Sequence, residues 1–298
     1  FSTTPYKWGG KNGNMFEYVI AETADEYLAL RSTFFFTYDF KIARYDKATL
    51  NLIEVKPLFP KDYIKKGGIR PTYSWGINQF KSQIYFLFGY KDQSKNNISV
   101  YHQKVNDDGS FNDSPNKLLE APFVNGSAGW FGGVYSFDST KFLSVYEVPT
   151  KAKENQQYSF HVYNIEDMSL VFEREVTLPF LDKDVNLERY EVDNEGNVYA
   201  LVKLKDKTNG GTNYKFKIYC INKSNGELME YDFENTLKQK VYLNSIIFLV
   251  KNNTLYCSGF WGKKSSASIS GVYSVRLDTK DGRELASDFY EFSDEFVA

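Results

Sequence analysis

The chain has 298 residues, enough to bury a large hydrophobic core, and 42% of them are hydrophobic, which excludes an intrinsically disordered protein. Its 36 basic and 38 acidic residues nearly balance, and a nucleic-acid-binding protein normally carries a basic excess, so we expect no nucleic-acid partner. No stretch reaches the roughly 18 consecutive apolar residues that a membrane-spanning helix needs, so we expect no transmembrane segment.

Aromatic residues are unusually frequent. The chain contains 23 Tyr and 25 Phe but only 3 Met, and aromatic rings pack well on the pleated surface of a sheet. Helical periodicity is nearly absent, so the sequence predicts an all-β protein.

One short pattern recurs five times: an alternating strand that ends in an apolar residue, then Asp or Asn, then a short turn. We call the Asp or Asn the anchor residue; the five are Asp46, Asn106, Asn164, Asn222 and Asp278. Their positions give intervals of 60, 58, 58 and 56 residues. Asp and Asn side chains bond to nearby backbone and start turns, and a following Gly supplies the positive φ that many hairpins need. Near-constant spacing therefore indicates one hairpin-based unit of about 58 residues, repeated five times.

Each unit contains room for four strands. In chain order the predicted units cover residues 16–59, 73–122, 133–180, 187–234 and 241–292. No composition shift marks a linker, so we expect a single domain over residues 1–298.

Repeated four-stranded units of this length predict a β-propeller of about five blades. Across its whole length the chain resembles the β-propeller superfamily of WD40-like and kelch-like proteins. The resemblance is architectural, because neither the repeated Trp-Asp dipeptide nor the kelch double glycine occurs here, and it implies no particular function. Two arrangements fit the repeats: a ring closed by five blades, or part of a larger propeller. A pair of β-sandwiches is the alternative, but it would not require constant spacing.

In a propeller, the loops between blades and those between the second and third strands lie on one face, and here these are the long loops. Each Trp has a Gly beside it or one residue away, which leaves an indole face open to sugars, aromatic groups or cations. The predicted ligand-binding face comprises Trp8, Arg70, Tyr73, Trp75, Trp130 and Trp261. Packing between blades is the competing interpretation, since Trp75 and Trp130 lie 55 residues apart, close to the repeat period.

Five-bladed propellers also include glycoside hydrolases, which need carboxylates on the inner strands. The candidates on predicted inner strands are Glu17, Asp138 and Glu191, with Glu188 nearby. No known glycosidase motif surrounds them.

Metal chemistry has little support in the sequence. His102 and His161 are the only histidines, and no paired ligand spacing occurs. Asp107, Asp108 and Asp113 offer oxygen ligands for Ca²⁺, but they lie at an ordinary hairpin turn, so we expect no cofactor. We interpret Cys220 and Cys257 as buried thiols; a disulfide between neighbouring repeats is the alternative.

The sequence favours a non-enzymatic binding or scaffold propeller that holds a protein, peptide or glycan on its Trp-bearing face. A carbohydrate-active hydrolase using Glu17, Asp138 and Glu191 is the alternative, and a subunit of a larger envelope assembly is a third. We expect an exported protein, because the chain begins at Phe1 rather than Met and is rich in Tyr, Asn and Lys.

Overall fold

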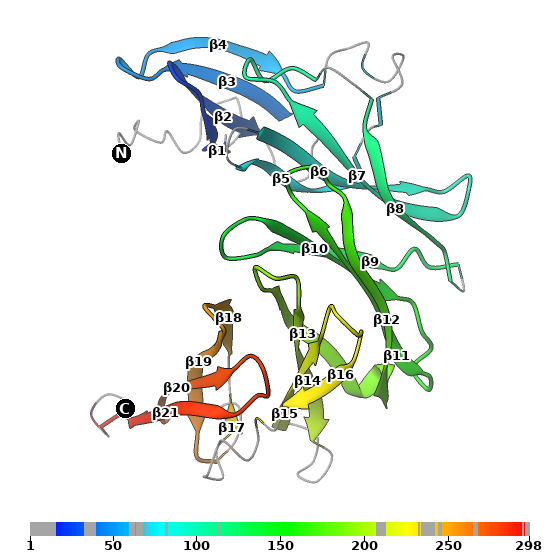
Figure 1. Ribbon diagram of the computed structural model, residues 1–298, viewed down its shortest axis with the longest axis vertical. Helices are drawn as coiled ribbons and strands as arrows, with labels where there is room; N and C mark the ends of the chain where they lie inside the picture. Colours follow the sequence, from blue (N-terminus) through cyan, green and yellow to red (C-terminus); the bar gives the residue numbers. More distant parts are fainter. Residues whose placement is uncertain are drawn as a thin grey trace. The chain divides into compact units, whose positions relative to one another are not determined.

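A computed structural model describes residues 16–32, 40–59, 63, 68–69, 71–80, 83–111, 114–124, 126–206, 213–231, 233, 242–243, 246–264, 268–293 and 295. Its secondary structure is almost entirely strand (Figure 1). The chain forms two compact units, Phe1–Ala128 and Gly129–Ala298, which we call the N-terminal and C-terminal units.

The N-terminal unit contains two four-stranded antiparallel sheets whose strands pair in chain order. The first sheet comprises β1 (Phe16–Glu22), β2 (Glu26–Ser32), β3 (Phe40–Asp46) and β4 (Leu52–Pro57). The second comprises β5 (Tyr73–Phe80), β6 (Gln83–Asp92), β7 (Asn97–Val105) and β8 (Asn116–Pro122). Buried Leu28, Ile42, Phe86 and Phe88 belong to the single apolar cluster that joins the two sheets.

The C-terminal unit contains three more antiparallel sheets. The third sheet comprises β9 (Trp130–Tyr135), β10 (Lys141–Val148), β11 (Asn155–Asn164) and β12 (Leu170–Leu181). The short 3₁₀ helix η2 (Asp182–Asp184) leads to the fourth: β13 (Val185–Val192), β14 (Val198–Asp206), β15 (Asn213–Ile221) and β16 (Leu228–Tyr231).

The fifth sheet departs from the pattern, because two short segments pair with the edge of its first long strand. These are β17 (Tyr242–Leu243) and β18 (Ile247–Lys251), and both pair with β19 (Thr254–Gly262), which is followed by β20 (Gly271–Asp278) and β21 (Glu284–Glu291). One apolar cluster joins the third and fourth sheets and another joins the fourth and fifth. The prediction of an all-β chain made of successive antiparallel units is confirmed, with four strands in each of the first four sheets and five in the last. The observed sheets begin or end at most three residues from the predicted bounds, at 130 against 133 and at 231 against 234.

All five anchor residues lie at the end of the third strand of their sheet, as predicted. The backbone N–H of each donates to a carbonyl oxygen four or five residues later, at 2.8–3.1 Å. The acceptors are the carbonyl oxygens of Asn51, Ser110, Ser169, Glu227 and Arg283. Side chains add to this, since Oδ1 of Asp46 accepts from the N–H of Thr49 at 2.7 Å. The repeat in the sequence is therefore a repeat of one turn geometry.

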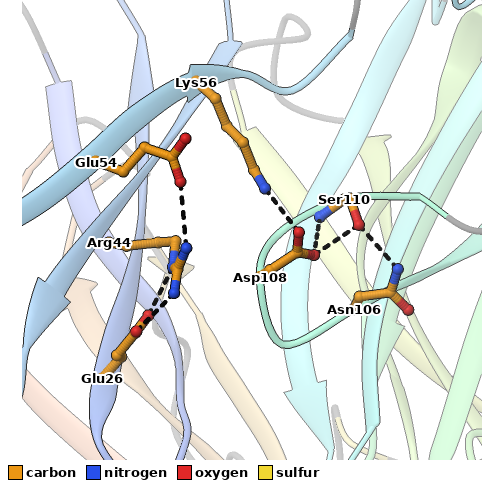
Figure 2. Close-up of polar contacts among 7 residues, drawn as sticks. All are labelled: Glu26, Arg44, Glu54, Lys56, Asn106, Asp108 and Ser110. Carbon is orange, nitrogen blue, oxygen red and sulfur yellow. Dashed lines mark hydrogen bonds and ion pairs between the residues drawn. The ribbon is translucent and has the colours of Figure 1, made fainter.

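In the N-terminal unit, charged side chains join the first sheet to the hairpin turn between β7 and β8 (Figure 2). Nζ of Lys56 lies 3.0 Å from Oδ2 of Asp108, whose Oδ1 accepts from the N–H of Ser110 at 2.9 Å. Arg44 donates two hydrogen bonds of 2.6 Å to Glu26 and a third, of 3.2 Å, to Glu54. Burial opposes ionisation of Asp108, but the Ser110 contacts and Lys56 together hold its pKa at about 2.

These contacts bear on the calcium hypothesis. The carboxylate of Asp108 already pairs with Lys56 and Ser110, and Asp113 lies outside the described residues. Within the described part of the chain, no three His, Cys, Asp or Glu side chains are grouped as a metal site.

The cysteines are free and buried, as predicted. Cys220 lies in β15 and Cys257 in β19, and burial raises the pKa of both thiols. Within the ranges given above, no helix has the length and apolar character needed to cross a membrane.

Candidate binding site

The structure separates the predicted Trp residues. Trp130 is the first residue of β9 and its side chain is 51% exposed. Trp261 is only 3% exposed: its Nε1 donates to the carbonyl oxygen of Val272 at 3.1 Å, and its ring lies edge-on to Phe289. Trp261 is therefore a buried packing residue of the fifth sheet, and its predicted place on an exposed face is wrong. Trp8 and Arg70 lie outside the described residues, as do the side chains of Tyr73 and Trp75 in β5.

Two glycines give Trp130 its position. Gly129 has φ +63°, and a Cβ there would lie 2.6 Å from the carbonyl oxygen of Glu147. A Cβ on Gly132 would lie 1.9 Å from Oη of Tyr190 and 2.5 Å from Cη2 of Trp130. The indole of Trp130 and the phenol of Tyr190, from β13 of the fourth sheet, therefore both approach the surface of β9 where Gly132 leaves room.

Trp130 heads a row of side chains that crosses the third sheet. Its Cα pairs directly with that of Glu147 in β10, and Glu147 pairs with Tyr158 in β11. Directly opposed residues of antiparallel strands project from the same face, so these three side chains are neighbours. We call them the Trp130 row. It runs from an exposed indole through a carboxylate to a phenol that is only 2% exposed.

The carboxylate of the row is in an unfavourable place for a negative charge. Burial raises the pKa of Glu147, and the nearby carboxylate of Asp182 raises it further. Asp182, the first residue of η2, has its Oδ1 3.2 Å from the hydroxyl of Thr150. Burial also raises the pKa of Tyr158, with Glu147 as the next cause. In the described part of the chain, neither Glu147 nor Asp182 takes part in an ion pair.

Of the three predicted catalytic carboxylates, the structure describes the side chains of Asp138 and Glu191. Asp138 lies in the turn between β9 and β10, not on the inner strand where the sequence placed it. Its Oδ1 accepts from the N–H of Thr140 at 2.9 Å and from the hydroxyl of Ser136 at 2.8 Å. Partial burial opposes ionisation, but these hydrogen bonds lower its pKa overall, which suits a turn residue and not a proton donor. Glu17 lies in β1, and its side chain is not among those that the structure describes.

Glu191, unlike Asp138, has a raised pKa. It is half-buried in β13, and burial raises its pKa from the usual 4.5 to about 7, against the opposing effect of Arg189. Register places it opposite Tyr199, whereas its neighbour Tyr190 projects from the other face of β13, toward Gly132. Glu191 therefore projects from the face of β13 opposite to that of Tyr190, which approaches the Trp130 row at Gly132.

We expect the Glu191→Gln variant to be stabilised at high pH. A raised folded-state pKa favours the folded protein below pH 4.5, and that advantage is lost as pH rises through about 7. The stability difference between variant and wild type should grow by about 1–3 kcal/mol between pH 5 and pH 8 in urea titrations. Glu175→Gln, at an exposed position of β12, is the comparison variant. An equal difference at both pH values for Glu191→Gln would contradict the raised pKa.

Sequence reasoning missed Glu147, Tyr158, Asp182 and Tyr190. A signal was present for Glu147, because it lies two residues after Val145 and four after Leu143, and so shares their face of a strand. An acidic residue at the third such position indicates a carboxylate on an otherwise apolar face. For Asp182 and Tyr190 no signal of this kind exists, since their places depend on how the fourth sheet packs on the third.

Comparison with known proteins identifies the fold. No protein-family model matches the sequence, and no curated protein sequence matches it. A solved structure of an ulvan lyase, a polysaccharide lyase, is 12% identical with a TM-score of 0.51 and covers 96% of this chain and 71% of that one. The Dos1 propeller is 12% identical with a TM-score of 0.49 and covers 93% of this chain; this chain spans 60% of its length. The propeller domain of the Trilobed protease from Pyrococcus furiosus is 13% identical with a TM-score of 0.47, covering 94% and 72%.

At 12% identity, the match to the ulvan lyase shows a similar fold and says nothing about function. Combined with the five successive antiparallel sheets, four of four strands and one of five, it shows that this chain has an all-β propeller fold.

Proposed function

We propose that this chain is a non-enzymatic binding propeller and that the Trp130 row contacts its ligand, a protein, peptide or glycan. The observation that carries the proposal is the 51% exposed indole of Trp130, which lies against Gly132 and is next to the carboxylate of Glu147 in register. Exposed Trp side chains supply large, rigid contact areas, and they are enriched among residues that dominate binding energy.

Arrays of peptides and glycans test this proposal. Wild type should retain a ligand that Trp130→Ala binds at least about 30-fold more weakly, because loss of a central Trp contact typically costs 2 kcal/mol or more. Phe260→Ala is the matched control, since Phe260 is also an exposed aromatic residue (42%) of the C-terminal unit. If Trp130→Ala binds every retained ligand as well as wild type does, the Trp130 row is not the site.

The second candidate is a carbohydrate hydrolase, and Glu191 favours it through a pKa of about 7, which is suitable for a general acid. Under this alternative, array glycans incubated with wild type should release reducing ends. Glu191→Gln should abolish the release while Trp130→Ala only weakens binding. Release that is unchanged in Glu191→Gln would exclude Glu191 from that role.

A further inference from the structure

We propose that the Trp130 row receives a cation, namely the Lys or Arg side chain of a peptide segment, which stacks on the indole and pairs with Glu147 and Asp182. This inference rests on the proposed function and adds the chemistry of its ligand.

The first support is the uncompensated negative charge. Glu147 is half-buried, and the negative charge of Asp182 adds to burial in raising the pKa of the Glu147 carboxyl. No Lys or Arg of the described residues pairs with either one. Some other carboxylates of the C-terminal unit do have a cationic partner, such as Glu230 with Lys217 and Glu291 with Lys263. A ligand cation would offset both the burial of Glu147 and the repulsion by Asp182.

The second support is the aromatic surface beside this charge. Trp130 and Tyr158 flank Glu147 in register, and Oη of Tyr190 lies beside the Trp130 ring at Gly132. Among the aromatic side chains, Trp attracts a cation placed over its ring face most strongly. The planar guanidinium of Arg can stack on an indole and donate hydrogen bonds to a carboxylate at the same time.

The third support is that the chain already makes this type of contact elsewhere. Nζ of Lys203 lies 4.3 Å from the ring centroid of Tyr214 and 3.9 Å from Oε2 of Glu188. Nζ of Lys251 lies 4.1 Å from the ring centroid of Phe137. At the Trp130 row the aromatic and acidic partners are both present, and in the described residues no cation of the chain pairs with the acids.

The test uses the full chain and four five-residue peptides, blocked at both ends, of Gly with a central Arg, Lys, citrulline or Gln. Citrulline is the neutral isostere of Arg. Isothermal titration should show binding of the Arg and Lys peptides, at least about tenfold weaker binding of the citrulline and Gln peptides, and weakening by added salt. Glu147→Gln and Asp182→Asn should each weaken Arg-peptide binding about tenfold, whereas the Glu175→Gln control should not change it.

The outcomes separate this inference from the proposed function. If the arrays find a neutral ligand that depends on Trp130, and Arg and citrulline peptides bind equally, the cation proposal is wrong and the binding function stands. If no probe binds in a Trp130-dependent way, both are wrong. Binding of a cationic amino-polysaccharide such as chitosan, dependent on Glu147 but without any peptide binding, would overturn the peptide assignment. Circular dichroism spectra of the variants that match wild type establish that they are folded.

Discussion

Replacing Phe160 by Ala should lower the free energy of unfolding of the C-terminal unit by about 3–5 kcal/mol. Phe160 lies in β11, is 2% exposed, and belongs to the apolar cluster between the third and fourth sheets. The fourth sheet contributes Val192 and Val202 to the same cluster. Truncation removes buried apolar surface and leaves a cavity. The backbone of β11 cannot move to close it, because hydrogen bonds fix this strand to β10 and β12. Urea unfolding followed by circular dichroism measures the change.

Phe137→Ala is the matched control for this prediction. Phe137 is 52% exposed in the turn between β9 and β10, where it contacts Nζ of Lys251, so its removal should cost no more than about 1 kcal/mol. If the two units unfold in separate transitions, only that of the C-terminal unit should move. Equal effects of the two substitutions would contradict the assignment of Phe160 to the core.

Replacing Asp193 by Ala should cost about 2–4 kcal/mol, because one carboxylate organises the whole turn between β13 and β14. Oδ1 of Asp193 accepts from the N–H groups of Gly196 at 2.7 Å and Asn197 at 2.8 Å. Oδ2 accepts from Nδ2 of Asn197 at 2.8 Å and from Oη of Tyr199 at 3.0 Å. Tyr199 is 1% exposed, so its hydroxyl would lose its partner where water cannot replace it.

Asp138→Ala provides the comparison, since Asp138 occupies the corresponding turn of the third sheet. Its hydrogen bonds to Ser136 and Thr140 are made near the surface, where water can take over, so we expect a loss of about 1 kcal/mol or less. Thermal and urea unfolding of both variants measure the difference. A loss at Asp193 no larger than that at Asp138 would show that burial of the Tyr199 hydroxyl is unimportant.

The repeat could be predicted because its cause is local. Asp46, Asn106 and the other anchor residues define a turn through bonds within five residues, so spacing along the chain reports the sheets directly. Alternation along strands such as β20 then fixes which face is buried. Asp138 shows the limit of such patterns. Its position next to the apolar strand Trp130–Tyr135 indicated an inner strand, but its side chain forms the turn that ends it.

The candidate site was less predictable because it depends on strand register and on packing between sheets. Trp130 and Trp261 have similar glycine neighbours in the sequence, yet one is exposed and the other is buried against Phe289. Glu147 becomes a neighbour of Trp130 only through the pairing of β9 with β10. Tyr190 reaches Gly132 only because the fourth sheet packs on the third.

Hydroxyl-radical footprinting, read by mass spectrometry, tests the central claim that the Trp130 row is the ligand site. The full chain is labelled alone and with saturating array-selected ligand, and oxidation of Trp130 is compared with that of the similarly exposed Phe260. Bound ligand should lower the oxidation rate of Trp130 severalfold and leave that of Phe260 unchanged. Unchanged oxidation of Trp130 in the presence of bound ligand would contradict it.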